Sequence, residues 1–231
     1  MAADKATPGR ARGKVPQWAP SRLQGIERSW IRRPSRHKAN LALLRLGDRK
    51  YVLKTVEDMP WFLRVTLGRW LLAREIATYR RLGDLEGIPR LIARVGKDAF
   101  LLSFEEGFPL RKEAKPHIKS HSFERLDSLV KAIHQRGVVH LDLGQRKNIL
   151  VREDGMPVIV DFGSAMGGSL PRPFGRILVF LLGWIDKRGL LMQRLRYGDG
   201  IPDEATRKAL KRANFWRGLW IFNRPSNPRR F

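Results

Sequence analysis

The chain has 231 residues, of which 42% are hydrophobic and none is cysteine. This length suffices for one domain or two small lobes with a buried core, and the lack of cysteine excludes disulfides and thiolate metal sites. The formal net charge of +24 indicates an anionic partner, such as nucleic acid, acidic lipid or a phosphorylated glycan.

The basic residues are concentrated at the two ends of the chain. Residues 1–36 carry nine basic and two acidic side chains, and residues 171–231 carry fourteen and four. The segment Met1 to Pro20 has no apolar run and so lacks the hydrophobic stretch typical of a signal peptide. We expect residues 1–24 to form a disordered basic tail.

The first predicted structural element is a β-hairpin. Its strands are Leu41–Leu46 and Tyr51–Val56, and Gly47-Asp48 marks the turn between them. Lys54 lies near the end of the second strand. A lysine at a strand end is usually solvated surface, so Lys54 gains meaning only from the residues that follow it.

A helix and a further strand come next. Residues Pro60–Arg81 have helical spacing, with a break near Gly68 and with Glu75 in the second part. Ala99–Phe104 then predicts a strand that runs into the polar segment Glu105-Glu106-Gly107. Together with the hairpin, these elements predict a small β-rich N-terminal part.

A second helix is predicted at Ser122–Gln135. Its apolar face consists of Leu126, Leu129, Val130 and Ile133. We expect the Ser122 side chain to cap the N-terminus of this helix and Gly137 to end it.

Three polar residues that follow this helix lie next to short apolar runs. Asp142 follows one such run, Asn148 opens a second and Asp161 closes a third. The connection Arg152–Pro157, with Asp-Gly at its centre, predicts a tight hairpin that would bring Asn148 and Asp161 side by side. Their oxygens can ligate Mg²⁺, and Asp142 lies close enough to take a hydroxyl proton. These are the parts that phosphoryl transfer requires.

After Gly163 the pattern is helical again. Its longest apolar run, Ile177–Ile185, has nine residues interrupted only by Gly183, which is short of the roughly 20 residues that span a bilayer. We expect a buried helix here. An interfacial helix, with Trp184 and flanking basic residues at a membrane surface, is the alternative. The pattern breaks a second time at Gly198–Pro202.

Five of these residues stand in the order found in protein kinases. They are Lys54, Glu75, Asp142, Asn148 and Asp161. On these residues the chain resembles the protein-kinase-like superfamily. The resemblance implies an α+β, compact bilobal fold. A small β-rich N-lobe would occupy residues 25–104, and a reduced helical C-lobe with a basic C-terminal extension would occupy residues 105–231.

The resemblance also implies a role for each of the five residues. Lys54 would hold the α- and β-phosphates of ATP, and Glu75 would hold the lysine. Asp142 would orient and deprotonate the acceptor hydroxyl. Asn148 and Asp161 would bind Mg²⁺.

Two further parts of the nucleotide site follow from the resemblance. The segment that contains Glu105 and Gly107 is similar to the kinase hinge, whose backbone would bind adenine, so we expect both residues to contact the nucleotide. No glycine-rich loop precedes Lys54. The basic segment Arg32–Lys38 stands where the phosphate cover would lie, and its charged groups can also bind phosphate.

Three other departures from the kinase pattern are visible. Leu141 replaces the arginine that usually pairs with an activation-loop phosphate. One extra residue separates Asp142 from Asn148, so Gln145 is an alternative metal ligand; we expect Asn148 to serve because it adjoins the strand. No Ala-Pro-Glu follows Asp161, which indicates a reduced peptide-docking region.

Within the superfamily, the chain is most similar to the bacterial lipopolysaccharide core kinases, which phosphorylate Kdo or heptose of the inner core. The matching segments are Pro60–Arg64, Leu67–Leu71, Arg74-Glu75, Leu85–Leu91, the Asp142 loop and Ile185–Arg188 with the basic run after it. The resemblance covers about residues 25–215. It implies ATP and Mg²⁺ as cofactors and an anionic glycolipid or phosphorylated glycan as the acceptor.

Three functions remain open. The first is an inner-core sugar kinase, cytoplasmic and peripheral on the inner face of the bacterial membrane, which its basic ends and tryptophans would bind. The tryptophans concerned are Trp18, Trp30, Trp184, Trp216 and Trp220. The second is a small Ser/Thr protein kinase of the RIO type. The third is a non-enzymatic basic module that binds nucleic acid or membrane, although no motif indicates specific nucleic-acid recognition.

Overall fold

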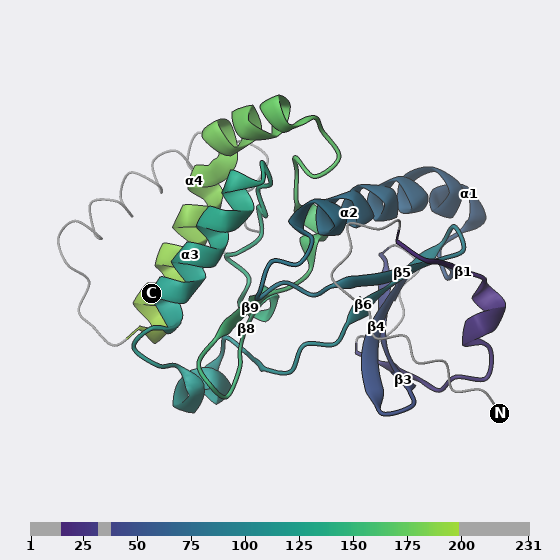
Figure 1. Ribbon diagram of the computed structural model, residues 1–231, viewed down its shortest axis with the longest axis horizontal. Helices are drawn as coiled ribbons and strands as arrows, with labels where there is room; N and C mark the ends of the chain where they lie inside the picture. The colour runs from purple at the N-terminus through teal and green to yellow at the C-terminus, as the bar shows by residue number, and fades with distance from the viewer. Residues whose placement is uncertain (1–14, 32–37, 199–231) are drawn as a thin grey trace. The chain divides into compact units, whose positions relative to one another are not determined.

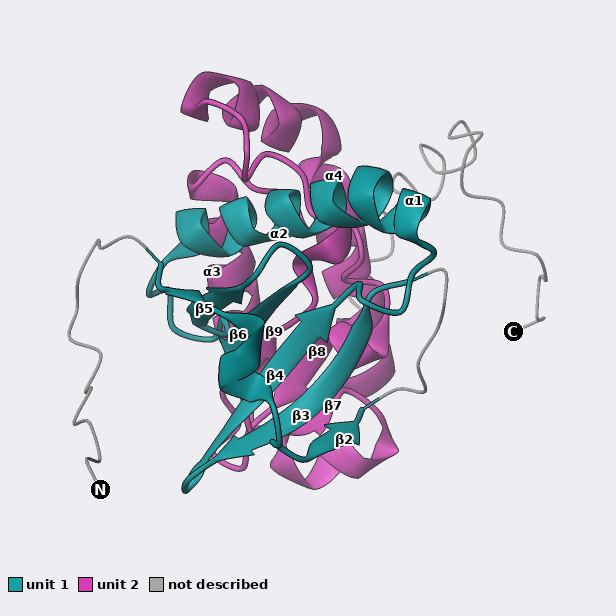
Figure 2. Ribbon diagram, turned by 90° about the vertical axis from the view of Figure 1, so that its right-hand side faces the viewer, with its two compact units in different colours: residues 1–105 teal, residues 106–231 magenta. Residues whose placement is uncertain are grey.

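A computed structural model of the chain describes residues 15–31 and 38–198. The chain divides into two compact units, Met1–Glu105 and Glu106–Phe231 (Figure 1 and Figure 2). The first unit is built on a large β-sheet, and the second is mainly helical. This mixed architecture is the α+β class that the sequence predicts.

The first unit contains a six-stranded sheet in the order β1-β5-β6-β4-β3-β2. Its strands are β1 (Gln17–Trp18), β2 (Arg28–Trp30), β3 (Asn40–Leu46), β4 (Arg49–Thr55), β5 (Leu91–Val95) and β6 (Ala99–Ser103). The predicted hairpin is confirmed, because β3 and β4 pair antiparallel. Gly47 in the turn has φ 60°, a left-handed conformation that glycine adopts at little cost. The central positions of β4 and β6 in this sheet are what bury Lys54.

Among the described residues of the first unit, regular secondary structure begins with β1 at Gln17. β1 pairs in parallel with β5, and the 3-10 helix η1 (Pro20–Leu23) buries Leu23 in the core beside Leu44 and Val95. The expectation of a disordered tail is therefore wrong for residues 17–23. The composition of this segment does not reveal a strand with which it pairs, because that strand, β5, lies far along the chain. Residues 1–14 lie outside the described residues.

The helix predicted after β4 is present and contains an irregular turn. Its parts are α1 (Trp61–Leu63), the π-helical segment η2 (Arg64–Gly68) and α2 (Arg69–Leu82). The break expected near Gly68 is thus a local widening of one continuous helix. α2 crosses the sheet and buries Leu72, Ile76 and Tyr79.

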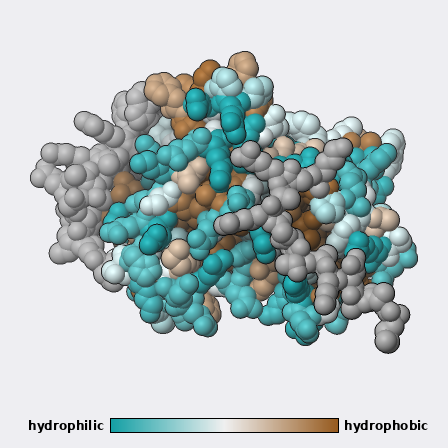
Figure 3. Space-filling model, in the orientation of Figure 1, coloured by the Kyte–Doolittle hydropathy of each residue, from teal (hydrophilic) through white to brown (hydrophobic). Residues whose placement is uncertain are grey.

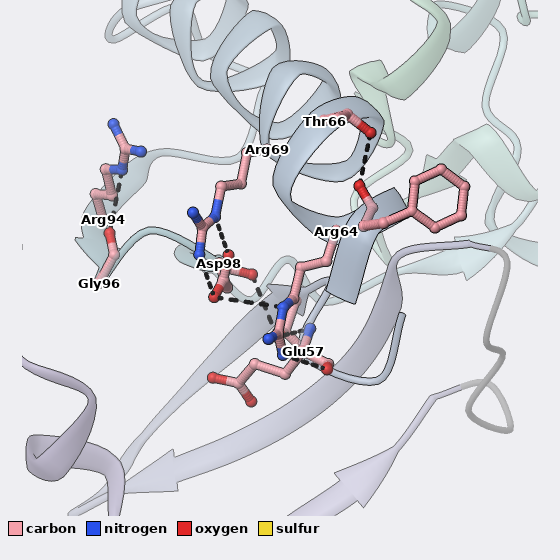
Figure 4. A network of polar contacts seen from close by, with 9 residues as sticks. Glu57, Arg64, Thr66, Arg69, Arg94, Gly96 and Asp98 are labelled. Atoms are coloured by element: carbon pink, nitrogen blue, oxygen red, sulfur yellow. Dashed lines mark hydrogen bonds and ion pairs between the residues drawn. The ribbon is translucent and has the colours of Figure 1, made fainter. Parts of the chain in front are cut away.

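A network of polar contacts holds the π-helical segment (Figure 4). Arg69 Nε donates to Asp98 Oδ1 at 2.6 Å, from the helix to the β5–β6 turn. Arg64 Nη1 donates to the carbonyl oxygen of Glu57 at 3.0 Å, and Thr66 Oγ1 donates to that of Phe62 at 2.7 Å. These contacts fix the start of α2, the helix that carries Glu75.

The second unit has a three-stranded sheet ordered β7-β8-β9. Its elements are β7 (Phe108–Pro109), η3 (Lys112–His117), α3 (Ser122–Gln135), η4 (Arg146–Asn148), β8 (Ile149–Val151), β9 (Pro157–Ile159), η5 (Phe162–Ser164) and α4 (Arg172–Tyr197). α3 has the predicted bounds, and β8 with β9 forms the predicted hairpin.

The two ends of α3 show one wrong and one confirmed prediction. Ser122 does not cap the helix: its Oγ accepts from the backbone N–H of Lys119 at 2.9 Å and donates to the carbonyl oxygen of Gly155 at 2.7 Å. The hydroxyl therefore ties α3 to the β8–β9 turn. Gly137 ends the helix, as expected, with φ 73°.

α4 packs against its surroundings through small side chains. Gly175, Gly183 and Gly189 are all buried, and a methyl group at Gly189 would lie 2.9 Å from the backbone of Leu143. The bulky side chains consequently point outward, and Phe180 is 87% exposed. The expectation that Ile177–Ile185 forms a buried helix is wrong, because glycines occupy the inward face that those apolar side chains would have filled.

Candidate active site

In the first unit, the two charged residues expected to act together form a buried ion pair. Lys54 Nζ lies 2.8 Å from Glu75 Oε1, and the two side chains are 9% and 3% exposed. Lys54 comes from β4, where it is paired with Phe100 of β6, and Glu75 comes from the inward face of α2. Removing a charged side chain from water costs free energy, and a nearby opposite charge offsets that cost. The pair therefore fixes the position of the ammonium group.

In the second unit, Asp142 and Asn148 are bonded to each other across one short loop. Asn148 Nδ2 donates to the carbonyl oxygen of Asp142 at 3.0 Å and to its carboxylate Oδ2 at 2.8 Å. Gln145 Nε2 donates to the two carboxylate oxygens at 2.8 and 2.7 Å. Two neutral amides thus orient the Asp142 carboxylate.

In the β8–β9 hairpin, Val160 lies opposite Asn148, and Asp161 is the next residue. Ile149 pairs with Ile159, and the backbone N–H of Val160 donates to the carbonyl oxygen of Asn148 at 2.9 Å. Asp161 itself has φ 62°, a left-handed conformation that is uncommon in residues other than glycine and that recurs at active sites.

The chemistry of this residue set fits Mg²⁺. The Asn148 amide nitrogen is engaged with Asp142, which leaves its carbonyl oxygen for a cation, and oxygen is the ligand that Mg²⁺ takes. Within residues 15–31 and 38–198, no group of three or more His, Asp or Glu side chains is arranged to hold a metal ion by itself. A metal at Asn148 and Asp161 would therefore take its remaining ligands from phosphates and water, as Mg²⁺ does in nucleotide sites.

The Asp142 loop is anchored from behind by Asp186 of α4. The fully buried Asp186 carboxylate accepts from the backbone N–H groups of His140 at 2.8 Å and Leu141 at 2.7 Å, and His134 Nε2 lies 2.9 Å away. These contacts hold Leu141 at φ 67°, which is rare for a branched side chain. Asp186 therefore sets the backbone that leads into Asp142.

A second buried residue of α4 supports the same loop. Gln193 Nε2 donates to the carbonyl oxygens of Gly144 at 2.8 Å and Leu143 at 3.3 Å. Asp186 and Gln193 thus satisfy backbone donors and acceptors on either side of Asp142, which would be costly to bury without partners.

His140 is a buried, neutral part of this loop. Burial lowers the pKa of its imidazole below the usual range, against the opposing effect of the nearby Asp186 carboxylate. Its Nδ1 accepts from the backbone N–H of Asp142 at 3.3 Å, so Nε2 carries the proton that faces the Val160 carbonyl oxygen at 3.2 Å. The histidine shapes the loop and joins it to the strand before Asp161.

The remaining predicted nucleotide contacts stay predictions. Glu105 ends the first unit and accepts a hydrogen bond from Ser103 Oγ at 2.8 Å. Gly107 is the second residue of the second unit, and a methyl group added to it would lie 3.1 Å from the Val151 carbonyl oxygen. Of the basic segment expected over the phosphates, residues 32–37 lie outside the described part of the chain.

Sequence reasoning missed the roles of Asp186, Gln193 and Gln145. The segment Ile185–Arg188 was matched to known kinases without a role for its aspartate. The signal available was a carboxylate directly after the apolar Trp184-Ile185, since a charge in such a setting is buried only with partners.

Solved structures that share this fold include kinases. The Rio2 kinase from Chaetomium thermophilum matches 83% of this chain and 64% of its own, with a TM-score of 0.56 and 16% identity. WaaP, in its complex with acyl carrier protein, matches 87% of this chain and 83% of its own, with a TM-score of 0.54 and 15% identity. The fold is protein-kinase-like. The sheet-containing first unit and the mainly helical second unit match the bilobal form of this fold.

The sequence comparisons are narrower. Serine/threonine-protein kinase C of Synechocystis sp. is 31% identical over 146 residues, which cover 55% of this chain and 26% of that protein. The chain thus spans about a quarter of its curated relative. No family model matches the chain.

Proposed function

We propose that the chain is an ATP-dependent kinase that transfers the γ-phosphate to a hydroxyl group. The observation that carries the proposal is the Asp142 loop, with its carboxylate oriented by two amides and its backbone fixed by Asp186. Phosphoryl transfer depends on a positioned base and on charge stabilisation, and it needs little covalent help from the protein.

Each lobe would supply one part of the reaction. In the N-lobe, Lys54 would bind the nucleotide phosphates while Glu75 holds the ammonium group in place. In the C-lobe, Asn148 and Asp161 would hold Mg²⁺, which neutralises phosphate charge when bound. Asp142 would accept the proton of the acceptor hydroxyl and orient its oxygen for in-line attack.

We propose an inner-core sugar of lipopolysaccharide, Kdo or heptose, as the acceptor. The segments Pro60–Arg64 and Ile185–Arg188 match this kinase family, and the likeness to WaaP and the net charge of +24 support it. The enzyme would be cytoplasmic and peripheral on the inner face of the bacterial membrane, where a lipid-linked core sugar is presented.

A second candidate is a small Ser/Thr protein kinase of the RIO type. The TM-score of 0.56 with Rio2 and the 31% identity with a Ser/Thr kinase favour it. A radiolabelled phosphate-transfer assay decides between the two, with purified core glycolipid and a generic protein substrate as competing acceptors. Label in the glycolipid alone supports the sugar kinase, and label in the protein alone overturns it.

Two substitutions test the catalytic assignment. Asp142→Asn should lower turnover on the order of 10²–10⁴-fold, the usual contribution of a general base, with little change in nucleotide affinity. Asp161→Asn should abolish most Mg²⁺-dependent nucleotide binding and nearly all turnover.

The matched control is Asp154→Asn in the exposed β8–β9 turn, where the carboxylate accepts from the backbone N–H of Met156 at 2.9 Å. It should leave both readouts unchanged. Undiminished turnover in Asp161→Asn contradicts the metal assignment, and a parallel loss of nucleotide binding and turnover in Asp142→Asn makes that residue structural.

A further inference from the structure

The N-terminal half of α4 presents bulky apolar side chains to solvent. Figure 3 shows apolar surface, in brown, over this end of the helix at the top of the view. We name it the α4 apolar patch; its members are Phe174 (58% exposed), Ile177 (54%), Phe180 (87%) and Leu181 (55%) of the helix and Leu170 (37%), which lies two residues before it.

The patch follows from the way in which α4 packs. The inward face is defined by glycines, with Gly183 so close to His134 that an added methyl group would lie 3.3 Å from the ring. Phe174, Ile177 and Leu181 recur at the spacing of one helix face, directed away from those glycines. An apolar cluster exposed in this way marks an interaction surface, since it contributes nothing to the core.

The segment of chain that carries the patch has exposed charges of one sign. Between residues 162 and 198 the chain has six basic residues and a single acidic residue, Asp186, whose carboxylate is fully buried. Arg172 and Arg176 are exposed beside the apolar residues, and Lys187 is exposed six residues beyond Leu181 on the same helix. The surface thus combines apolar side chains with a local positive charge.

We propose that the α4 apolar patch docks on an anionic lipid bilayer. Phe174, Ile177, Phe180 and Leu181 would enter the boundary between headgroups and acyl chains, and Arg172 and Arg176 would pair with lipid phosphates. Among the described helices, none is both long and apolar enough to cross a bilayer. The inference rests on the proposed function for its purpose, which is to meet a lipid-linked acceptor at its membrane.

Charge complementarity favours lipid over two other occupants. A symmetric pairing of two copies through the patch would gather the arginines of both copies in one interface, where their like charges repel. Residues 199–231 of the same chain carry eight basic and three acidic side chains, so they also add like charge. An anionic bilayer neutralises the arginines, whereas a second copy or residues 199–231 would place further positive charge beside them.

A fluorescent probe tests insertion directly. Since the chain has no cysteine, Phe180→Cys gives a single site for a polarity-sensitive dye, and Lys131→Cys on α3 gives a matched exposed site outside the patch. With phosphatidylethanolamine–phosphatidylglycerol vesicles, the emission at position 180 should shift to the blue, and the emission at position 131 should not. The shift should weaken in high salt and on neutral phosphatidylcholine vesicles.

Co-sedimentation with the same vesicles tests the side chains. Phe180→Ser combined with Leu181→Ser should lower the partition coefficient at least about tenfold, because two exposed side chains lose their burial in lipid. The control is Trp61→Ser combined with Phe62→Ser in α1, an apolar pair of similar exposure (74% and 57%) in the other unit. It should leave partitioning unchanged.

In co-sedimentation, equal partitioning of wild type and the α4 variant, or an equal loss of partitioning in the control, overturns the inference. In the fluorescence experiment, so does a blue shift at position 180 without lipid, if the shift grows with protein concentration or disappears when residues 199–231 are deleted. Those two fluorescence results would assign the patch to a second copy or to the chain's own C-terminal segment. Phosphate transfer to a soluble, lipid-free core oligosaccharide keeps the proposals apart. Phosphate transfer without vesicle binding would contradict only the proposed docking surface. Vesicle binding without phosphate transfer to any acceptor would contradict only the kinase assignment.

Discussion

At the residue scale, the amides of Gln145 and Asn148 orient the Asp142 carboxylate. Gln145 contributes two hydrogen bonds from an exposed side chain, so it can yield to an incoming hydroxyl. Asn148 contributes another from a buried side chain and stays in place. The two amides therefore differ in function: Asn148 fixes the base, and Gln145 covers it.

Gln145→Ala and Gln145→Glu test this difference. We expect Gln145→Ala to change kcat by less than about tenfold, since Asn148 still orients the carboxylate. Gln145→Glu puts a second negative charge against Asp142 and should lower kcat by about tenfold or more. Steady-state kinetics at fixed pH measures both effects. Gln135→Glu at the end of α3 is the control, and equal kcat values in Gln145→Glu and wild type would contradict the contact.

The Lys54–Glu75 pair has a consequence for stability as well as activity. Lys54→Met removes the cation 2.8 Å from a carboxylate that is 3% exposed, and loss of one member of a buried pair costs about 3–5 kcal/mol of unfolding free energy. Glu75→Met should cost a similar amount. The double variant should recover much of the stability and none of the activity, and chemical denaturation with an ATPase assay measures both. Additive losses in the double variant would show that the two side chains do not depend on each other.

At the scale of elements, α4 has two different faces. Its inward face carries the glycines together with Asp186 and Gln193, which fix the loop before β8. Its outward face carries the apolar patch. One helix therefore joins the proposed base to the proposed membrane surface, and the glycines are what allow both, because they bring the helix backbone close to the loop.

Asp186→Asn tests the anchor against a control on the same helix pair. The asparagine keeps the size but cannot accept from all the donors that the carboxylate satisfies, so we expect a loss of about 1–3 kcal/mol and a lower kcat with little change in ATP affinity. Asp127→Asn removes the exposed ion pair between α3 and Arg194 of α4, with both side chains 51% exposed, and should cost less than about 1 kcal/mol. Equal effects of the two substitutions on kcat would refute the anchor.

At the scale of the whole molecule, two ionisable groups make stability depend on pH in the same direction. A hydrogen bond from Arg69 lowers the pKa of the Asp98 carboxyl, and burial lowers the pKa of the His140 imidazole. In both cases the unfolded chain binds a proton at a higher pH than the folded chain does. Stability is therefore highest above the ordinary pKa of each group and falls as the pH drops below it.

The effect of His140 on stability falls in a pH range that melting experiments can cover. Below the ordinary histidine pKa of 6.5, each pH unit should remove up to about 1.4 kcal/mol until the folded protein also takes the proton. The melting temperature measured by circular dichroism should fall between pH 7.5 and 5.5, and His140→Gln should flatten that slope. His121→Gln, at a half-buried position before α3, serves as the control. A slope that is unchanged in His140→Gln would contradict the prediction.

The amino-acid sequence by itself determined the parts of this protein that depend on neighbours along the chain. The β3–β4 and β8–β9 hairpins, the bounds of α3 and the end of α3 at Gly137 all follow from spacing and turn residues. The order of Lys54, Glu75, Asp142, Asn148 and Asp161 also predicted the protein-kinase-like fold. These features are local or sequential, so pattern and spacing are sufficient to find them.

Only the tertiary structure decided the features that depend on distant contacts. Asp186 binds a backbone 46 residues away, and β1 pairs with β5 across more than 70 residues, so neither partner is visible from nearby sequence. The outward direction of Phe180 was likewise undetermined. An apolar run of nine residues satisfies either a buried or an exposed helix, and the choice depends on which face the glycines bring against α3 and the Asp142 loop. The physical reason is that burial is a property of packing partners, which spacing along the chain does not specify.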